Sequence, residues 1–166
     1  MQVPSQSDVA GLLARLVAHE LPSGSGLQAW DSFLRAHATL MRRLEVDLAQ
    51  ATGLALADFD VLAQLARAGG ALRMTDLAAR ALVSRSGMTR RVARLVDEGL
   101  VRRANADADG RGVVVALTDA GVARLTEAAP VHLRGVSELF VAQLGDQELA
   151  ALKNALDKVT VDCTFG

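Results

Sequence analysis

The feature that most restricts the fold of this chain is one pair of short strand-like segments set among segments of helical periodicity. Residues 100–104 and 113–117 are strand-like, and a run rich in Asn, Asp and Gly separates them. Two such segments around such a loop predict a β-hairpin. Apart from a minimal strand at 72–74, the other apolar patterns repeat at helical spacing. The fold class is therefore predicted to be mainly α with a small β-hairpin.

The helical segments show apolar side chains at the i, i+3, i+4, i+7 spacing of amphipathic helices. They are predicted over 8–20, 27–51, 58–68, 75–82, 85–98, 119–129 with a continuation to about 144, and 147–159. The PSGSG segment at 22–26 predicts a turn, and Pro130 predicts an interruption or a kink. Thr75, Ser84 and Thr118 are predicted N-caps, because a hydroxyl there can accept a backbone N–H.

The composition excludes several classes of protein. Apolar residues make up 51% of the chain and aromatic residues 3%, so the core is predicted to be aliphatic. The single cysteine, Cys163, excludes a disulfide framework and favours an intracellular, cytoplasmic location. No run approaches the roughly 18 apolar residues that span a bilayer, and the N-terminus lacks the pattern of a signal peptide. We therefore expect no membrane partner.

The charge is unevenly distributed along the chain, although the net charge is only −1. Residues 73–117 contain nine Arg and five acidic residues, and the rest of the chain contains nine basic and fourteen acidic residues. Arginine offers a planar set of donors that suits phosphate and guanine. The cluster favours a nucleic-acid partner for this segment, although a solvated face with chance clustering is the alternative.

The predicted helix 85–98 follows a Ser cap and has an outer face without an acid until Asp97. Such a face can enter the major groove of double-stranded DNA without repulsion by phosphates. The alternative is an ordinary amphipathic helix with soluble arginines. The candidate DNA-binding residues of this helix are Ser84, Arg85, Ser86, Thr89, Arg90 and Arg94.

Arg111 lies at the predicted tip of the hairpin, between Gly110 and Gly112. An arginine on such a tip can enter a narrow, A·T-rich minor groove, and Asp109 could orient its guanidinium through a bidentate pair. Asp109 and Arg111 are therefore candidate DNA-binding residues. Alternatively, Asp107 and Asp109 only form the turn.

The segment 74–121 resembles the DNA-binding core of the MarR (multiple antibiotic resistance regulator) family. The matching motifs are SRSGMTRRV at 84–92, VDEGLVRR at 96–103, DGRG at 109–112 and ALTDAG at 116–121. The resemblance implies a winged helix-turn-helix with long dimerisation helices. It further implies a homodimer that binds a pseudo-palindromic operator, most commonly as a ligand-responsive repressor. Gly110 departs from the family pattern, in which that position is often basic.

The resemblance also implies a small aromatic or phenolic effector that binds between the dimerisation helices and the DNA-binding lobe. Trp30, His37 and Arg43 lie on the long helix expected to line such a cleft. Trp30 and His37 are seven residues apart and hence on one helix face. The alternative is that Trp30 is a core or interface residue and that His37 is partly exposed.

The predicted organisation has an N-terminal helical extension (1–26), two dimerisation segments (27–57 and 119–166) and a DNA-binding domain (58–118) between them. An enzyme is not expected, because no nucleophile elbow, phosphate loop or metal-ligand cluster occurs among three scattered His and one Cys. No cofactor and no metal are expected. The open alternatives are a metal- or redox-sensing regulator of the same fold and a helical scaffold that does not bind DNA.

Overall fold

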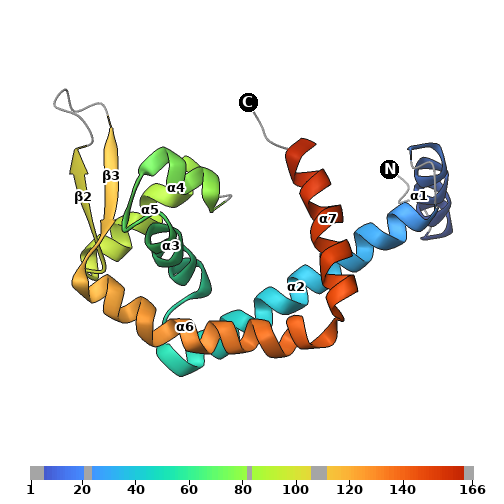
Figure 1. Ribbon diagram of the computed structural model, residues 1–166. Helices are drawn as coiled ribbons and strands as arrows, with labels where there is room; N and C mark the ends of the chain where they lie inside the picture. Colours follow the sequence, from blue (N-terminus) through green and yellow to red (C-terminus); the bar gives the residue numbers. More distant parts are fainter. Residues whose placement is uncertain (1–5, 21–23, 82–83, 106–111, 163–166) are drawn as a thin grey trace. The chain divides into compact units, whose positions relative to one another are not determined.

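The structure, a computed structural model, describes residues 6–20, 24–81, 84–105 and 112–162 (Figure 1). The chain divides into two compact units, residues 1–42 and 43–166. The first unit contains α1 (Gln6–Glu20) and the larger part of α2 (Gly24–Thr52). Within the described ranges, no helix combines the length and the apolar character that a membrane crossing needs.

The second unit contains the end of α2 and all later elements: three short helices with a short strand after the first, then a hairpin and two longer helices. The elements are α3 (Leu56–Arg67), β1 (Ala71–Arg73), α4 (Met74–Arg80), α5 (Arg85–Asp97), β2 (Val101–Asn105), β3 (Val113–Leu117), α6 (Asp119–Leu139), the 3-10 turn η1 (Val141–Gln143) and α7 (Asp146–Asp162). The predicted fold class, mainly α with a small β-hairpin wing, is confirmed.

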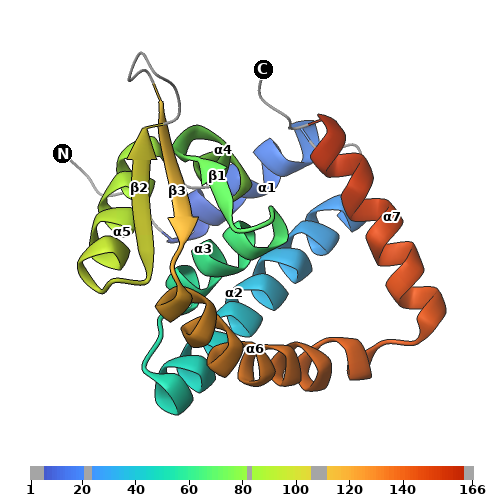
Figure 2. The ribbon, with the colours of Figure 1, turned by 60° about the vertical axis from the view of Figure 1, so that its left-hand side comes forward.

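The three strands form one antiparallel sheet in the order β1-β3-β2 (Figure 2). Val115 of the central strand β3 pairs with Leu72 of β1 and with Arg103 of β2. The hairpin is as predicted, with β2 one residue later in the chain than expected. Pairing with β1 ties the hairpin to the chain segment that precedes α4.

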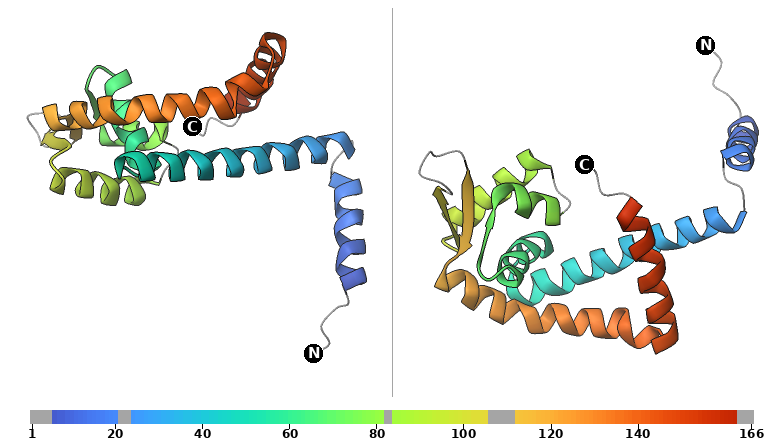
Figure 3. Two further views of the ribbon diagram at one scale, coloured as in Figure 1. Left: turned by 90° about the horizontal axis from the view of Figure 1, so that it is seen from below. Right: turned by 45° about the horizontal axis from the view of Figure 1, so that its top comes forward.

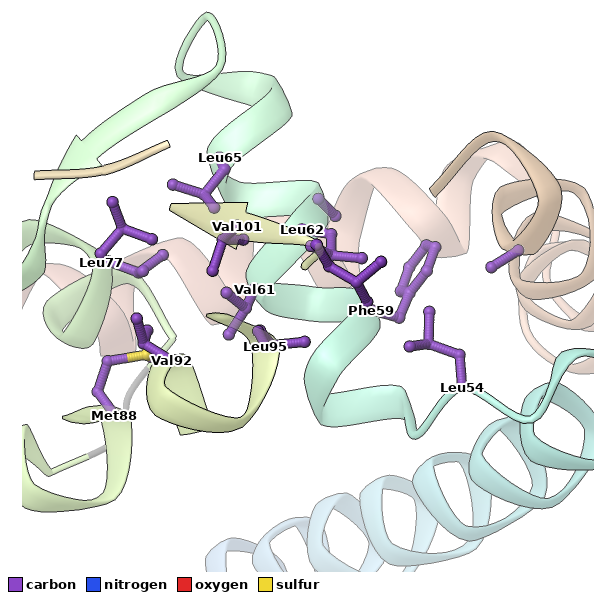
Figure 4. Packing of buried hydrophobic residues seen from close by; sticks show 14 of the residues in the cluster. Leu54, Phe59, Val61, Leu62, Leu65, Leu77, Met88, Val92, Leu95 and Val101 are labelled. Carbon is purple, nitrogen blue, oxygen red and sulfur yellow. The ribbon is translucent and has the colours of Figure 1, made fainter. Parts of the chain in front are cut away.

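The core of the second unit lies where α3, α4, α5 and the sheet meet (Figure 4). Leu62 and Leu65 of α3 and Leu95 of α5 are fully buried. Removing a side chain of this size from water stabilises the fold by about 1.5–3 kcal/mol. Phe59 is the one aromatic residue of this otherwise aliphatic cluster, in agreement with the prediction from composition.

Two of the three predicted helix caps are confirmed. The Ser84 hydroxyl accepts the backbone N–H of Gly87 at 3.2 Å, and the Thr118 hydroxyl accepts that of Gly121 at 3.0 Å. The predicted cap at Thr75 is wrong, because α4 already begins at Met74 with Arg73 in the cap position. Pairing of Arg73 with Val114 carries β1 up to the start of the helix, which leaves Thr75 inside the first turn.

Three predicted helix boundaries are corrected. The helix α2 begins at Gly24, inside the segment predicted to turn at 22–26, because Gly and Ser are tolerated where a helix begins. Pro130 does not interrupt α6, which is continuous over residues 119–139 (Figure 3). Pro130 is exposed, so water can replace the hydrogen bond that the ring removes. The expected continuation to 144 ends instead at Leu139, and the turn η1 follows.

Candidate nucleic-acid interface

The helix α5 packs through one apolar face and is fixed at its N-terminus by Ser84. Met88, Val92 and Leu95 are all fully buried in the core (Figure 4). They lie three or four residues apart, which places them on one side of a helix. The Ser84 hydroxyl lies 3.3 Å from that of Ser86 and also caps the helix. The core therefore determines which side of α5 faces outward.

The outward side of α5 carries most of the candidate DNA-binding residues. Ser84, Ser86, Thr89, Arg90 and Arg94 are all exposed. The first turn of the helix contains no acidic residue, and the first acid on the helix is Asp97. The side chain of Arg85 lies outside the described residues. The arrangement gives α5 a polar, cationic surface without carboxylates in its first three turns.

Two arginines of α5 share one buried carboxylate on α3. Arg91 Nη1 donates to Asp58 Oδ1 at 2.9 Å, and Arg94 Nη2 donates to the same oxygen at 2.6 Å. The hydrogen bond from Arg94 to Asp58 raises the pKa of its guanidinium above the ordinary value, and the charge of Asp58 adds to this effect. Both arginines are therefore held by a carboxylate of α3.

Sequence reasoning missed the role of Asp58 and assigned no role to Arg91. A signal for Asp58 exists in the sequence, because position 58 lies on the same helix face as Leu62 and Leu65. An acidic residue on an apolar face needs a partner when it is buried. The identity of that partner depends on how α3 and α5 pack, which the spacing along the chain does not reveal.

An open hollow of about 240 Å³ lies along α5. Its lining consists of Gly87, Arg90, Arg91 and Arg94. A lining with three arginines makes the hollow suited to an anion such as a phosphate group. Among the described residues, the Nε atom of Arg91 is buried and lacks a hydrogen-bond partner.

The strand β2 also contacts α5. Arg103 Nη2 donates to the main-chain carbonyl of Thr89 at 3.1 Å, and this hydrogen bond connects the hairpin to α5. The last ladder pair of the hairpin joins Asn105 and Val113. The candidate wing residues Asp109 and Arg111 lie outside the described residues.

Of the candidate effector residues, Trp30 and His37 lie on α2 with the ring of Phe33 between them. The ring centroids of Trp30 and Phe33 are 6.0 Å apart, and those of Phe33 and His37 are 6.3 Å apart. All three residues are exposed. Arg43 belongs to the second unit, where its Nε donates to both carboxylate oxygens of Asp47 at 3.0 and 2.9 Å. The first part of α2 therefore carries three neighbouring rings, those of Trp30, Phe33 and His37.

His132 is a half-buried polar residue with a buried Nδ1 atom, and sequence reasoning did not place it in any site. Its ring on α6 lies 4.5 Å from the ring of Phe59, measured between centroids. Burial lowers the pKa of His132 below its ordinary value, and the charge of Arg67 acts in the same direction. The described residues offer no hydrogen-bond partner to its Nδ1 atom. The neutral imidazole is therefore the favoured form.

Large apolar side chains are exposed on the helices outside the α3–β3 core. In the second unit they include Val122 and Leu133 of α6, with 50% and 62% of their surface exposed, and Val159 of α7 with 60%. The first unit adds Leu12 and Leu16 of α1. Scattered exposed apolar residues are normal, but a recurrence along terminal helices is typical of an interface with another chain.

Clusters suited to a metal are not found in the described part of the chain, where no three His, Cys, Asp or Glu side chains come together as ligands. The His and Cys residues lie apart in the sequence, and Cys163 falls outside the described ranges. The polar side chains that gather in one place are instead those around α5.

A capped helix that lies across the preceding short helix, followed by a hairpin tied to it, defines a winged helix-turn-helix protein. The family model for the MarR family matches residues 52–112, the segment from the end of α2 to the start of β3. AbsC, a MarR family transcriptional regulator from Streptomyces coelicolor, has a similar structure with a TM-score of 0.78 and 30% sequence identity. The similarity covers 84% of this chain and 95% of AbsC. The chain belongs to the MarR family of transcriptional regulators.

Two further solved structures are informative. Sco3205, a MarR family transcriptional regulator from Streptomyces coelicolor, was solved in complex with DNA and is 29% identical, with a TM-score of 0.81. The match covers 87% of this chain and 91% of Sco3205. BpsR of Bordetella bronchiseptica, whose DNA binding is regulated by 6-hydroxynicotinic acid, is 25% identical with a TM-score of 0.70. That match covers 80% of this chain and 98% of BpsR.

Proposed function

We propose that this protein represses transcription by binding a pseudo-palindromic operator as a homodimer, with α5 in the major groove and Arg111 in the minor groove. The observation that carries the proposal is the division of α5 into two faces. Met88, Val92 and Leu95 are fully buried, whereas Ser86, Thr89 and Arg90 are exposed. A helix with this division can present short polar and cationic side chains to base edges without losing its packing.

The homodimer is proposed from the exposed apolar side chains of the terminal helices. Two recognition helices must lie about one DNA turn apart to read the two half-sites, and a two-fold dimer supplies that spacing. Leu133 of α6 is the most exposed of these side chains. Leu133→Asp is expected to shift the protein from dimer to monomer in analytical ultracentrifugation and to weaken operator binding. If the Leu133→Asp variant remains a dimer, Leu133 does not contribute to the interface.

The effector is proposed to be a small aromatic acid or a phenolic compound. The regulation of BpsR by 6-hydroxynicotinic acid supports this class of molecule. The exposed rings of Trp30, Phe33 and His37 offer stacking partners for it, and Arg43 offers a cation. A ligand that favours a dimer with wrongly spaced recognition helices would lower DNA affinity by a shift in population.

The DNA-binding proposal is tested by selection and salt titration. The wild-type protein is incubated with a pool of randomised duplexes, and the most enriched duplex is compared with a random duplex of equal length. Binding is followed by fluorescence anisotropy at several salt concentrations. Phosphate-driven binding should weaken steeply with salt, by a slope of about 0.9 for each phosphate neutralised. No enrichment and no binding at low salt would favour the scaffold alternative instead.

Two variants assign the roles of individual arginines. Arg90→Ala is expected to lower affinity more on the enriched duplex than on random DNA, because base contacts carry sequence preference. Equal losses on both duplexes would contradict base reading by Arg90. Arg111→Ala is expected to weaken binding chiefly to duplexes with A·T-rich flanks, where the minor groove is narrow. Arg134→Ala on α6, outside the proposed DNA-binding surface, serves as the charge-matched control.

A further inference from the structure

Asp58 differs from the other acidic residues of the described chain in being almost completely buried, with 5% of its surface exposed. It lies in the first turn of α3, next to Phe59 in the core cluster. Isolated buried carboxylates are costly, and pairing with cations offsets that cost. In this protein both cations come from α5, the helix that carries the proposed DNA-contacting side chains.

The pairing fixes the directions in which two guanidinium groups can donate. Arg91 and Arg94 are three residues apart, so both can reach one carboxylate. Asp58 engages Nη1 of Arg91 and Nη2 of Arg94, at 2.9 and 2.6 Å. A guanidinium is planar and has five N–H donors, so its remaining donors have set directions once one edge is bound. The side chain of Arg94 is still 52% exposed and available to a ligand.

Arg90 provides the contrast on the same helix. It is exposed, and in the described part of the chain it takes no part in an ion pair. All three arginines line the hollow along α5. An unpaired, long side chain can follow a phosphate wherever the duplex places one, whereas a paired one is confined. Confinement favours a duplex whose phosphates match the fixed donor directions.

The turn of α3 that carries Asp58 is itself held in place by α2. Glu45 of α2 accepts the backbone N–H of Leu56 at 2.9 Å, in the first turn of α3. Asp58 follows two residues later, and its own N–H donates to the carbonyl of Ala55 at 3.0 Å. The anchor for Arg91 and Arg94 therefore belongs to a turn whose position is fixed by α2 and by the core.

From these contacts we propose that Asp58 is a positioning residue that makes DNA binding selective, by holding Arg91 and Arg94 so that they meet operator phosphates but not those of arbitrary duplexes. The inference rests on the proposed function and adds a residue that does not itself touch DNA. Asp58 neutralises positive charge on α5 that could otherwise bind phosphates. Neutralising Asp58 should free Arg94, the more exposed of the two cations, at the proposed DNA-binding surface and strengthen binding to any duplex.

The test compares Asp58→Asn with wild type on the enriched duplex and on the random duplex, over a series of salt concentrations. We expect the ratio of enriched to random affinity to fall by at least about tenfold. We also expect the salt slope on random DNA to steepen by about 1 per protomer, the effect of one added phosphate contact. The double variant Asp58→Asn/Arg94→Gln should return that slope to its wild-type value.

Asp60→Asn is the matched control, because Asp60 lies on the same helix and loses the same charge, but among the described residues it accepts only from Gln64, at 3.4 Å. It should behave as wild type on both duplexes. A parallel fall of both affinities in Asp58→Asn, with an unchanged salt slope, would mean that Asp58 only supports folding and would overturn the inference. Identical behaviour of the Asp58 and Asp60 variants would overturn it as well.

Arg94→Gln keeps the test decisive if Asp58→Asn fails to fold, because Arg91 remains as a partner for the carboxylate. We expect it to weaken binding to the enriched duplex and to leave the salt slope on random DNA unchanged. Equal losses of affinity on both duplexes, together with a shallower salt slope, would show that Arg94 makes an ordinary phosphate contact and would contradict the inference. A wild-type protein that neither enriches a duplex nor binds at low salt would instead remove the proposed function, and the inference with it.

Discussion

Glu45 of α2 caps α3 across eleven residues of chain: its Oε2 atom accepts the backbone N–H of Leu56 at 2.9 Å. The cap residue of α3, Ala55, has no side chain that could do this. A helix leaves its first N–H groups without intrahelical partners. The carboxylate of one helix therefore completes the N-terminus of the next, which places Asp58 and the core residues of α3.

Removal of this cap should lower the free energy of unfolding. Glu45→Ala is expected to cost about 1 kcal/mol, the usual effect of losing an N-terminal cap. Glu45→Gln keeps an acceptor oxygen and should lose less. Urea unfolding followed by circular dichroism measures both values. Glu127→Ala on α6 is the control, since its carboxylate is exposed and, within the described part of the chain, pairs only with Arg124. Equal stability of the Ala variant and wild type would contradict the capping role.

Gly121 allows α6 to begin directly beside the turn that follows α5. A Cβ atom at this position would lie 2.0 Å from the main-chain oxygen of Leu100. Backbone cannot move aside without disturbing the Thr118 contact to the same carbonyl, at 3.0 Å. Gly121→Ala should therefore destabilise the fold by at least about 2 kcal/mol. Thermal unfolding is the measurement.

Gly135 on the same helix supplies the comparison. A Cβ atom there would meet only the end of the Leu44 side chain, at 2.7 Å. A side chain can rotate away, and alanine favours a helix over glycine by about 1 kcal/mol. Gly135→Ala should thus lower the free energy of unfolding clearly less than Gly121→Ala does. The reverse order of the two melting temperatures would refute the argument from backbone contact.

His132 should make the stability depend on pH. Its pKa is lowered in the folded protein, chiefly by burial, from an ordinary value of 6.5. The unfolded chain therefore takes up a proton before the folded one as the pH falls. The free energy of unfolding should be highest above pH 6.5, decline as the pH falls below it, and level off below the lowered folded pKa.

Urea unfolding between pH 8 and pH 5 tests this dependence, with His132→Gln as the variant. The difference in stability between wild type and the variant should shrink on acidification, since only the wild type carries this half-buried imidazole. His19→Gln is the control, because that ring is exposed with 83% of its side-chain surface accessible. A constant difference across the range would mean that His132 does not contribute to the pH dependence.

Trp30 offers a direct optical test of the proposed effector site, because the chain contains a single Trp and no Tyr. Titration with a hydroxybenzoate is expected to change the Trp emission in a saturable way and to weaken DNA binding over the same concentration range. His37→Leu should raise the Kd for the compound by about tenfold. His19→Leu should leave it unchanged. A loss of DNA binding without any change in emission would place the effector elsewhere.

The sequence predicted most of the fold because its signals are local. Apolar spacing located the helices, and β-branched residues around an Asn, Asp and Gly loop located β2 and β3. The caps at Ser84 and Thr118 followed from hydroxyl side chains at helix starts. Thr75 was wrongly predicted as a cap because pairing of β1 with β3 decided where α4 begins, and that pairing joins residues about forty positions apart along the chain.

The sequence alone determined which side chains α5 offers to a partner, because a 3.6-residue period separates Met88 and Val92 from Ser86 and Arg90 whatever surrounds the helix. Only the tertiary structure decided that Arg91 and Arg94 are bound by a carboxylate 33 and 36 residues away. It likewise decided that His132 meets Phe59. Such contacts depend on the packing of α3 against α5 and α6, and packing arises from the whole core rather than from any local run of residues.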